Sequence, residues 1–215
     1  MLKNIKFIIF DLDGTLIDSS DGVVEAVNYS LTMMGEQPQH PEKIKPFIGF
    51  PLQTMYPHFS DKPIDDLYRH FQVKAAETVV SSTIQLDAVE PTLQELKDSG
   101  YILSIASTKI KEHISGVIDK FNWHNLITAY SGGNEVAEVK PAPDIFKLTM
   151  QKLSADKTNA IVVGDTINDV IAAQKAGLPV IAVRSPYGDD EELKKSKPNY
   201  IVDHITEIKK IIDIM

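Results

Sequence analysis

The stretch Ile5-Lys6-Phe7-Ile8-Ile9-Phe10-Asp11-Leu12-Asp13-Gly14-Thr15 decides the fold. It begins with an apolar run rich in Ile and Phe, which predicts a strand buried on both faces of a sheet. The strand ends in two carboxylates, Asp11 and Asp13, followed by a glycine that allows a sharp turn. Buried acids are costly unless something uses them, and open α/β sheets bind ligands beyond the carboxyl ends of their strands. The stretch therefore predicts a functional site.

Two other interpretations of this stretch are an acidic turn that caps the next helix and a calcium-binding loop. Asp and Gly are common in turns, so the stretch alone leaves the first interpretation open. An EF-hand loop needs a Glu at its twelfth position, and position twelve counted from Asp11 is Gly22. The calcium loop is therefore excluded.

Composition limits the class of protein and its partners. A chain of 215 residues with 43% hydrophobic and 24% charged residues can bury a full core in one or two domains. A net charge of −8 with only two arginines, Arg69 and Arg184, disfavours nucleic acid as a partner. The lack of cysteine excludes disulfides and thiolate sites. Asp11 interrupts the first apolar run, and no run reaches membrane-spanning length, so we expect a cytoplasmic protein without a membrane partner. Nothing in the composition indicates an oligomeric state.

Residues 17–84 are predicted to form a small α-helical domain, inserted into a core made of residues 1–16 and 85–215. Asp18-Ser19-Ser20-Asp21 offers N-cap candidates for a helix that stops at Gly35. Residues 36–63 hold six prolines, which predict short helices and loops. A second helix is expected from about residue 64 to residue 80, and its apolar positions include Leu67, Phe71, Val73 and Val79.

From residue 85 onward, the pattern alternates between strands and helices. Strands are expected at 101–106, 126–130, 160–163, 180–183 and 200–202, and helices at 89–99, 111–121, 140–153, 167–176 and 205–214. This alternation predicts an α/β fold with a Rossmann-like, mostly parallel sheet and right-handed crossovers.

Polar side chains gather where the predicted strands end. Each has a local explanation: Ser107 and Thr108 could cap a helix, Lys140 could be solvated, and Asp165 and Asp169 could be helix N-terminal acids. Because the ends of parallel strands meet at one edge of a sheet, these residues are expected to share a site with the first two carboxylates.

In family order, Asp11-Leu12-Asp13-Gly14-Thr15, Ser107, Lys140-Pro141-x-Pro143 and Gly164-Asp165-x-x-x-Asp169 resemble the four motifs of the haloacid dehalogenase-like (HAD) hydrolase superfamily. The helical insertion resembles that family's small cap. The resemblance covers almost the whole chain and is closest to the phosphoglycolate phosphatase and β-phosphoglucomutase-like branch.

The resemblance implies a Mg²⁺-dependent phosphatase that hydrolyses a small phosphorylated metabolite through an aspartyl-phosphate. Asp11 would be the nucleophile and Asp13 the general acid and base. Mg²⁺ would be held by Asp11, Asp165 and the backbone carbonyl of Asp13. An acid at position 13 also separates phosphoryl chemistry from that of the haloacid dehalogenases proper.

The remaining motif residues would support this chemistry. Ser107, Thr108 and Lys140 would bind the phosphoryl oxygens. Asp169 would orient Lys140 or reach the metal through water, with the orienting role preferred. Thr15 would be a further supporting residue near the metal.

Substrate choice would be set by the cap, since the core handles only the phosphoryl group. The candidates are Gly49, Phe50, Lys43, Lys45 and Arg69, although each also has a surface or packing explanation.

Four other functions compete with the phosphatase. A sugar-phosphate mutase of the same branch would carry a cap histidine where this chain has Val23 and an arginine where it reads Gly49-Phe50-Pro51-Leu52. An inorganic pyrophosphatase stays open. A phospho-accepting signalling domain would lack the helical insertion, and an inactive scaffold would lack catalytic positions that this chain keeps.

Overall fold

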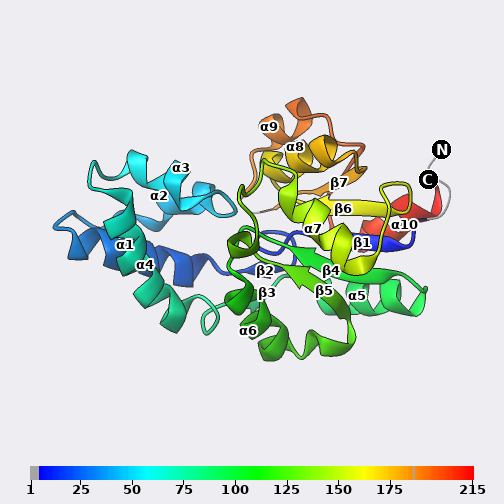
Figure 1. Ribbon diagram of the computed structural model, residues 1–215, viewed down its shortest axis with the longest axis horizontal. Coiled ribbons are helices and arrows are strands. Elements are labelled where there is room, and N and C mark those ends of the chain that lie inside the picture. The colour runs from blue at the N-terminus through cyan, green and yellow to red at the C-terminus, as the bar shows by residue number, and fades with distance from the viewer. Residues whose placement is uncertain (1–4, 186) are drawn as a thin grey trace.

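Strand β1 (Phe7–Phe10) is the centre of a parallel sheet of six strands in the order β5-β4-β1-β6-β7-β8. The computed structural model, which describes residues 5–185 and 187–215, is shown in Figure 1. The other strands are β4 (Ile102–Ala106), β5 (Ile127–Ser131), β6 (Ala160–Gly164), β7 (Val180–Val183) and β8 (Tyr200–Val202). Every neighbouring pair is parallel. The predicted Rossmann-like α/β fold is therefore confirmed.

Alternation along β1 builds a core on each face of the sheet. Ile8 and Phe10 point into one hydrophobic cluster, and Phe7 and Ile9 point into the other. Helices α5 (Val89–Asp98), α6 (Lys111–Phe121) and α10 (Ile208–Asp213) cover the first face. Helices α7 (Asp144–Leu153), α8 (Ile167–Ala176) and α9 (Asp190–Lys195) cover the second. A strand buried on both sides is what its unbroken apolar run predicted.

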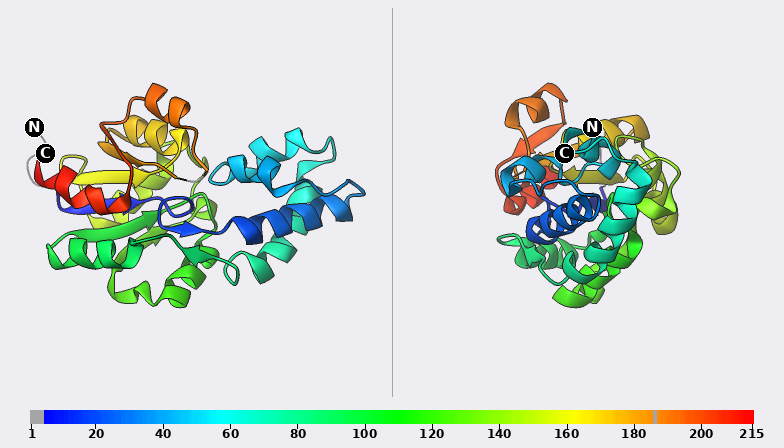
Figure 2. Two further views of the ribbon diagram at one scale, coloured as in Figure 1. Left: turned by 180° about the vertical axis from the view of Figure 1, so that it is seen from behind. Right: turned by 90° about the vertical axis from the view of Figure 1, so that its left-hand side faces the viewer.

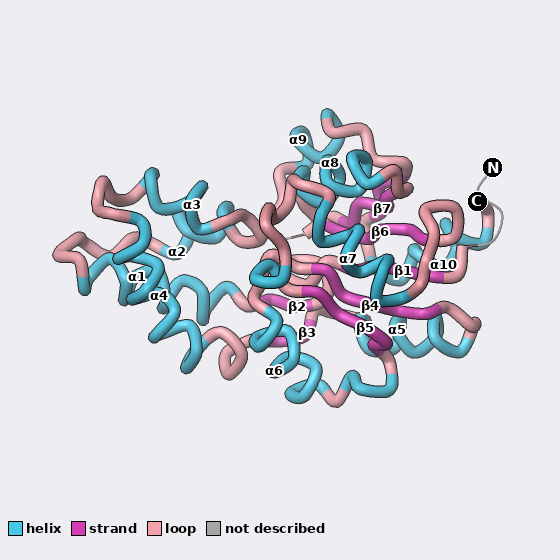
Figure 3. The backbone as a smooth tube through the Cα atoms, viewed as in Figure 1, coloured by secondary structure: helices cyan, strands magenta, loops and turns pink. Residues whose placement is uncertain are grey.

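Residues 19–83, here called the helical insertion, contain only helices and the loops that join them (Figure 3). The long helices α1 (Ser20–Met33) and α4 (Ile64–Thr78) pack side by side, and between them in sequence come α2 (Pro41–Ile44), η1 (Lys45–Phe47), α3 (Leu52–Met55) and η2 (Tyr56–His58). The helical insertion has a hydrophobic cluster of its own, made of Val27, Leu31, Ile44, Met55, Tyr56 and Leu67. Figure 2 shows it at one end of the molecule, with the C-terminus at the opposite end.

Two short strands join the helical insertion to the sheet. Strand β2 (Ile17–Asp18) pairs antiparallel with β3 (Ile84–Gln85), so the chain leaves and returns through one ribbon. Lys120 of α6 holds the returning segment, because its ammonium donates to the carbonyl oxygens of Val80, Ser81 and Thr83 at 3.1, 2.7 and 2.6 Å. The Tyr187 hydroxyl donates to Asp18 in the outgoing strand.

Several local features differ from the sequence-based expectations. Val73 is 58% exposed, so it is not an apolar core position of α4. The helix expected from residue 140 begins only at Asp144, because residues that precede proline, such as Lys140 and Ala142, disfavour the helical conformation. Helix α9 and the ribbon of β2 with β3 were not predicted. The last helix is split into η5 (Ile205–Glu207) and α10, and two further 3₁₀ turns, η3 (Trp123–Asn125) and η4 (Gly133–Glu135), flank β5.

The chain segments that the structure describes include no helix with both the length and the apolar character needed to cross a bilayer.

The crossing of α1 and α4 predicts that Gly22→Ala destabilises the protein. A Cβ at Gly22 would lie 2.7 Å from the carbonyl oxygen of Thr78 and 2.8 Å from the Cα of Val79, so backbone would have to move. We expect a loss of about 1–3 kcal/mol in the free energy of unfolding, measured by urea denaturation.

Gly116→Ala in α6 is the matched control. The nearest atoms to its Cβ would be the methyl groups of Val80, at 3.1 and 3.2 Å, and alanine favours a helix by up to about 1 kcal/mol. We expect this variant to stay within about 1 kcal/mol of the parent. Equal stability of the two variants would contradict the close helix crossing.

Candidate active site

The carboxyl ends of the three central strands bring the motif residues together. Asp11 and Asp13 follow β1, Ser107 follows β4, and Asp165 follows β6. Lys140 enters from the loop before α7. Each of these residues is 5% exposed or less, although all are polar or charged. Such burial requires that each polar group have a partner or a ligand.

Lys140 lies between two carboxylates. Its Nζ donates to Asp11 Oδ1 at 2.5 Å and to Asp169 Oδ1 at 2.6 Å. The ammonium also lies 5.1 Å from the centre of the Phe146 ring. Burial by itself would lower the pKa of Lys140, but the attraction of the two carboxylates outweighs it and raises the pKa. Lys140 is therefore charged throughout the neutral range.

Burial also changes the pKa of the acids around this lysine. Burial raises the pKa of Asp11 to about 7, in spite of the opposing attraction of Lys140. The pKa of Asp165 is raised well above its ordinary value by burial and by the negative charges of Asp11 and Asp169. One lysine thus does not compensate the three acids, and the cluster favours a further cation.

Asp169 is held by contacts at both of its carboxylate oxygens. Oδ1 accepts from Lys140, and Oδ2 accepts from the backbone nitrogen of Thr166 at 3.0 Å and from the Thr166 hydroxyl at 2.7 Å. Asp169 is thus also the acid of a capping box at the start of α8. These contacts favour the role in which Asp169 orients Lys140.

The surroundings of Asp165 fit a divalent cation. Thr15 donates to Asp165 Oδ1 at 3.0 Å, whereas Oδ2 is buried without a hydrogen-bond partner among the described residues. Gly14 leaves this oxygen uncovered, because a Cβ there would overlap it. Three carboxylate oxygens lie within 4.8 Å of one another, one each from Asp11, Asp165 and Asp169. Clustered carboxylate oxygens are the ligands that Mg²⁺ prefers.

Asp13 has different surroundings from Asp11. Its carboxylate accepts from the Ser19 hydroxyl and lies 3.2 Å from the Nζ of Lys109. The Lys109 side chain is only 8% exposed. Sequence reasoning did not select Lys109 as a site residue, and its only signal was its position directly after Ser107 and Thr108.

Ser107 and Thr108 do not cap the next helix. Helix α6 begins at Lys111 with Ile110 at its N-cap position. Ser107 Oγ accepts from the backbone nitrogen of Lys109 at 3.2 Å, and the Thr108 hydroxyl donates to the carbonyl oxygen of Gly49 in the helical insertion at 3.4 Å. The structure thus gives neither residue the capping role that was their local explanation.

A cavity of about 780 Å³ lies between this sheet edge and the helical insertion. Asp13, Thr108 and Lys140 line it from the core, and Gly49 and Phe50 line it from the helical insertion.

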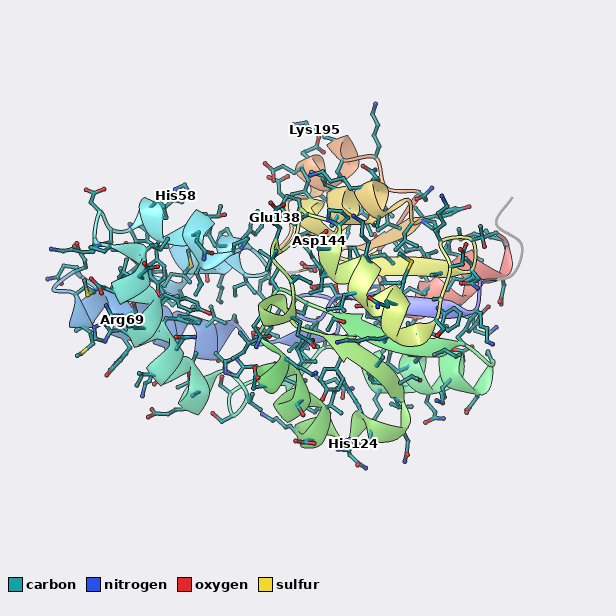
Figure 4. The ribbon with its side chains drawn as sticks, viewed as in Figure 1. His58, Arg69, His124, Glu138, Asp144 and Lys195 are labelled. Carbon is teal, nitrogen blue, oxygen red and sulfur yellow. The ribbon has the colours of Figure 1, made fainter. Side chains whose placement is uncertain are left out.

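The other three residues proposed for substrate choice lie outside the lining of that cavity. Lys45 pairs with Glu42 at 3.3 Å, and Arg69 pairs with Asp66. Lys43 is exposed, and Figure 4 shows Arg69 on the part of the helical insertion that lies away from the core.

Substitution of Lys140 by methionine tests the ion-pair cluster. Lys140→Met leaves buried carboxylates without their cation, so we expect the free energy of unfolding to fall by about 3–5 kcal/mol in EDTA above pH 7. An acid whose pKa rises on folding destabilises the folded state as the pH rises, here from about 4 to about 7 for Asp11. The loss should therefore shrink below pH 7.

Lys111→Met is the control for the loss of a lysine. Lys111 pairs with Glu135 at 3.1 Å, but its side chain is 44% exposed. An exposed pair contributes less than about 1 kcal/mol. If Lys140→Met lowers the free energy of unfolding no more than Lys111→Met does, Lys140 does not stabilise the buried carboxylates as described.

Comparison with known proteins places this site in a family. The family model described as "Haloacid dehalogenase-like hydrolase" matches residues 8–183, which include all four motifs. Pyrophosphatase PpaX of Bacillus velezensis is 27% identical over 215 residues, which cover 99% of this chain and 98% of that protein. Phosphoglycolate phosphatase of Pasteurella multocida is 27% identical over 225 residues, which cover 99% of this chain and 100% of the relative.

A solved structure agrees with both. The crystal structure of a predicted phosphatase from Clostridium acetobutylicum superposes with a TM-score of 0.91 and 28% identity, and it covers 99% of this chain and 100% of that one. Since the family match spans most of the sheet and all the motif residues, the chain belongs to the haloacid dehalogenase-like hydrolase family.

Proposed function

We propose that this chain is a Mg²⁺-dependent phosphatase that hydrolyses a small phosphorylated metabolite through an aspartyl-phosphate. The observation that carries the proposal is the pair of carboxylates at the end of β1, which have different partners. Asp11 contacts Lys140 and the acidic cluster, whereas Asp13 contacts Lys109 and lines the cavity. Two acids in different environments can take two roles.

In the proposed first step, a carboxylate oxygen of Asp11 bonds to phosphorus while the bond from phosphorus to the leaving oxygen breaks. Asp13 gives its proton to that leaving oxygen. In the second step, Asp13 takes a proton from water, the water oxygen bonds to phosphorus, and the Asp11 carboxylate is released. Phosphate and the free alcohol are the products.

Other residues would hold the phosphoryl group during both steps. The ammonium of Lys140, the Ser107 hydroxyl and the Thr108 backbone amide would bind its oxygens. Mg²⁺, held by Asp11, Asp165 and the Asp13 carbonyl, would neutralise negative charge that otherwise repels the nucleophile. Thr15 would orient Asp165, and Asp169 would orient Lys140.

Pyrophosphate hydrolysis is the second candidate, because one relative carries the name pyrophosphatase. This reaction would use the same core residues and would differ only in its leaving group, which is phosphate instead of an alcohol. A mutase is disfavoured, since apolar Val23 lines the cavity where a mutase would place its histidine.

We also propose that residues 17–84 form a cap domain on a core of residues 1–16 and 85–215, whose residues 1–4 lie outside the described residues. The separate hydrophobic cluster and the single connecting ribbon support this division. Hydrogen exchange tests it: amides of α1 and α4 should open together, with a free energy that differs from that of β1. If the amides of α1, α4 and β1 all exchange through one opening with the same free energy, the helical insertion is not a separate domain.

Metal binding should stabilise the protein, and more so at higher pH. Ligand carboxylates must lose their protons, and burial raises the pKa of Asp11 to about 7. Excess Mg²⁺ at about 100 times its Kd adds about 2.7 kcal/mol, which raises Tm by roughly 5–10 °C. We expect the larger rise above pH 7, measured by thermal unfolding with Mg²⁺ against EDTA.

Asp165→Asn is the control for this metal effect. It should lose most of the Mg²⁺ response while keeping the fold, because it removes one charge from a cluster that has too many acids. A full response in this variant, or full turnover in EDTA, would count against the proposed metal site.

The two carboxylates should separate kinetically. Asp11→Asn should form no phosphoenzyme with any ester, detected as the mass of one added phosphoryl group after acid quench. Asp13→Asn should be slowed by about 100-fold or more on alkyl esters. With an aryl ester, whose leaving group needs no proton, Asp13→Asn should form the phosphoenzyme and accumulate it. Normal turnover by Asp11→Asn would overturn the covalent route.

A further inference from the structure

The cavity above the carboxylates has a charged end and an apolar end. Asp13, Lys109 and Lys140 lie at the charged end, where the phosphoryl group would be held. The wall contributed by the helical insertion is made of Val23, Phe47, Phe50, Leu52, Phe71 and Val79. The polar side chains that accompany this wall, Gln53, Tyr68 and Gln72, carry amide and hydroxyl groups. Whatever leaves from phosphorus would therefore meet an apolar surface.

The positive charges around the cavity are already paired or lie at its rim. Lys109 lies 3.2 Å from Asp13, and Lys140 contacts Asp11 and Asp169. Lys175 is exposed and shares the lining with exposed Glu138, which Figure 4 places where the core faces the helical insertion.

Histidine and arginine add no positive charge to the cavity. Burial and nearby Lys109 lower the pKa of His113, so its imidazole is neutral at neutral pH. Both arginines of the sequence are paired elsewhere: Arg69 with Asp66, and Arg184 with Asp190 and Asp203.

We propose that the leaving group is an uncharged, mainly apolar alcohol that packs against Phe50, Phe71 and Val79, so that phosphate esters of such alcohols are better substrates than 2-phosphoglycolate or pyrophosphate. The proposal rests on the proposed phosphatase function and narrows its substrate class. The carboxylate of glycolate, or the second phosphoryl group of pyrophosphate, would lie against the apolar wall without a free cation from residues 5–185 or 187–215. Desolvation of an unpaired charge is costly, whereas each buried methylene is favourable.

A binding experiment tests the apolar end without any turnover. Alkylphosphonates cannot be hydrolysed, and 3-phosphonopropanoate has the same chain length in heavy atoms as butylphosphonate but ends in a carboxylate. With excess Mg²⁺, calorimetry should show affinity that rises about three- to fourfold per methylene from ethyl- to hexylphosphonate. Butylphosphonate should bind at least tenfold more tightly than 3-phosphonopropanoate. Equal or tighter binding of the carboxylate would overturn the proposal.

Turnover of the matching esters tests substrate choice. The ratio kcat/KM should rise along ethyl, butyl and hexyl phosphate and should be at least tenfold higher for hexyl phosphate than for 2-phosphoglycolate or pyrophosphate. Alkyl esters have leaving groups of similar intrinsic reactivity, so the series reports the contact with the cavity wall.

Two arginine variants on α4 form a matched pair. Ala76 lines the cavity, whereas Val73 is exposed and lies outside the lining. Ala76→Arg should lower kcat/KM for hexyl phosphate and raise it for 2-phosphoglycolate, each by about tenfold, while Val73→Arg should change neither. If Ala76→Arg leaves the ratio of kcat/KM for hexyl phosphate to that for 2-phosphoglycolate unchanged, the leaving group does not contact this wall of the cavity.

The two levels of the hypothesis fail in different ways. If no phosphate ester is hydrolysed but alkylphosphonates bind in the expected order, the phosphatase proposal is wrong and the apolar site stands. If 2-phosphoglycolate is the preferred substrate, the phosphatase proposal stands and the apolar leaving group is wrong. If pyrophosphate is the preferred substrate, the apolar leaving group is wrong and pyrophosphate hydrolysis replaces the phosphatase proposal.

Discussion

The ion pairs that Lys140 makes with Asp11 and Asp169 are the contacts on which the rest of the site depends. Three buried acids meet at one edge of the sheet, and Lys140 is the cation that lets two of them approach one another. The arrangement requires strands β1 and β6 to be neighbours and the loop before α7 to reach across their ends. The parallel sheet supplies this geometry, since all its strands end at the same edge. The negative charge that remains is what makes the site suitable for a divalent cation.

The helical insertion also shapes the charged end of the cavity. Ser19, its first residue, donates to Asp13, and the carbonyl of Gly49 accepts from Thr108. The surroundings of Asp13 are therefore built partly by the helical insertion, whereas those of Asp11 are built by the core. This difference supports the separate roles proposed for two carboxylates that are only two positions apart in the sequence. The same contacts bring the apolar wall over the charged end of the cavity.

Much of the fold could be predicted from local pattern. The buried run before Asp11 and the later alternation of strands and helices have clear periodicity, so the central sheet followed from them. The ribbon of β2 and β3 has only two residues in each strand, which is too short for any period to be visible. Val73 belongs to the apolar pattern of α4 but faces solvent. The pattern would look the same if Val73 were buried, so the sequence could not reveal its exposure. Lys109 could not be identified because its contact with Asp13 depends on how β1 and β4 are placed relative to each other. The positions of Lys45 and Arg69 outside the cavity depend on the packing of the helical insertion, which no local pattern encodes.

The central position of β1 has a consequence for the order in which the protein can form during synthesis. Phe7 pairs with Ile102 on one side and with Ala160 on the other, so β1 has no neighbouring strand until β4 has been made and lacks its second neighbour until β6 has been made. Until then its apolar side chains have no sheet to enter, and Asp11 has no counter-ion, since Lys140 is also made late. The helical insertion, whose contacts are closer in sequence, can fold first. A nascent chain of this design thus carries the apolar side chains of β1 unpaired until β4 and β6 have been made, so the core on both faces of the sheet can close only late in translation.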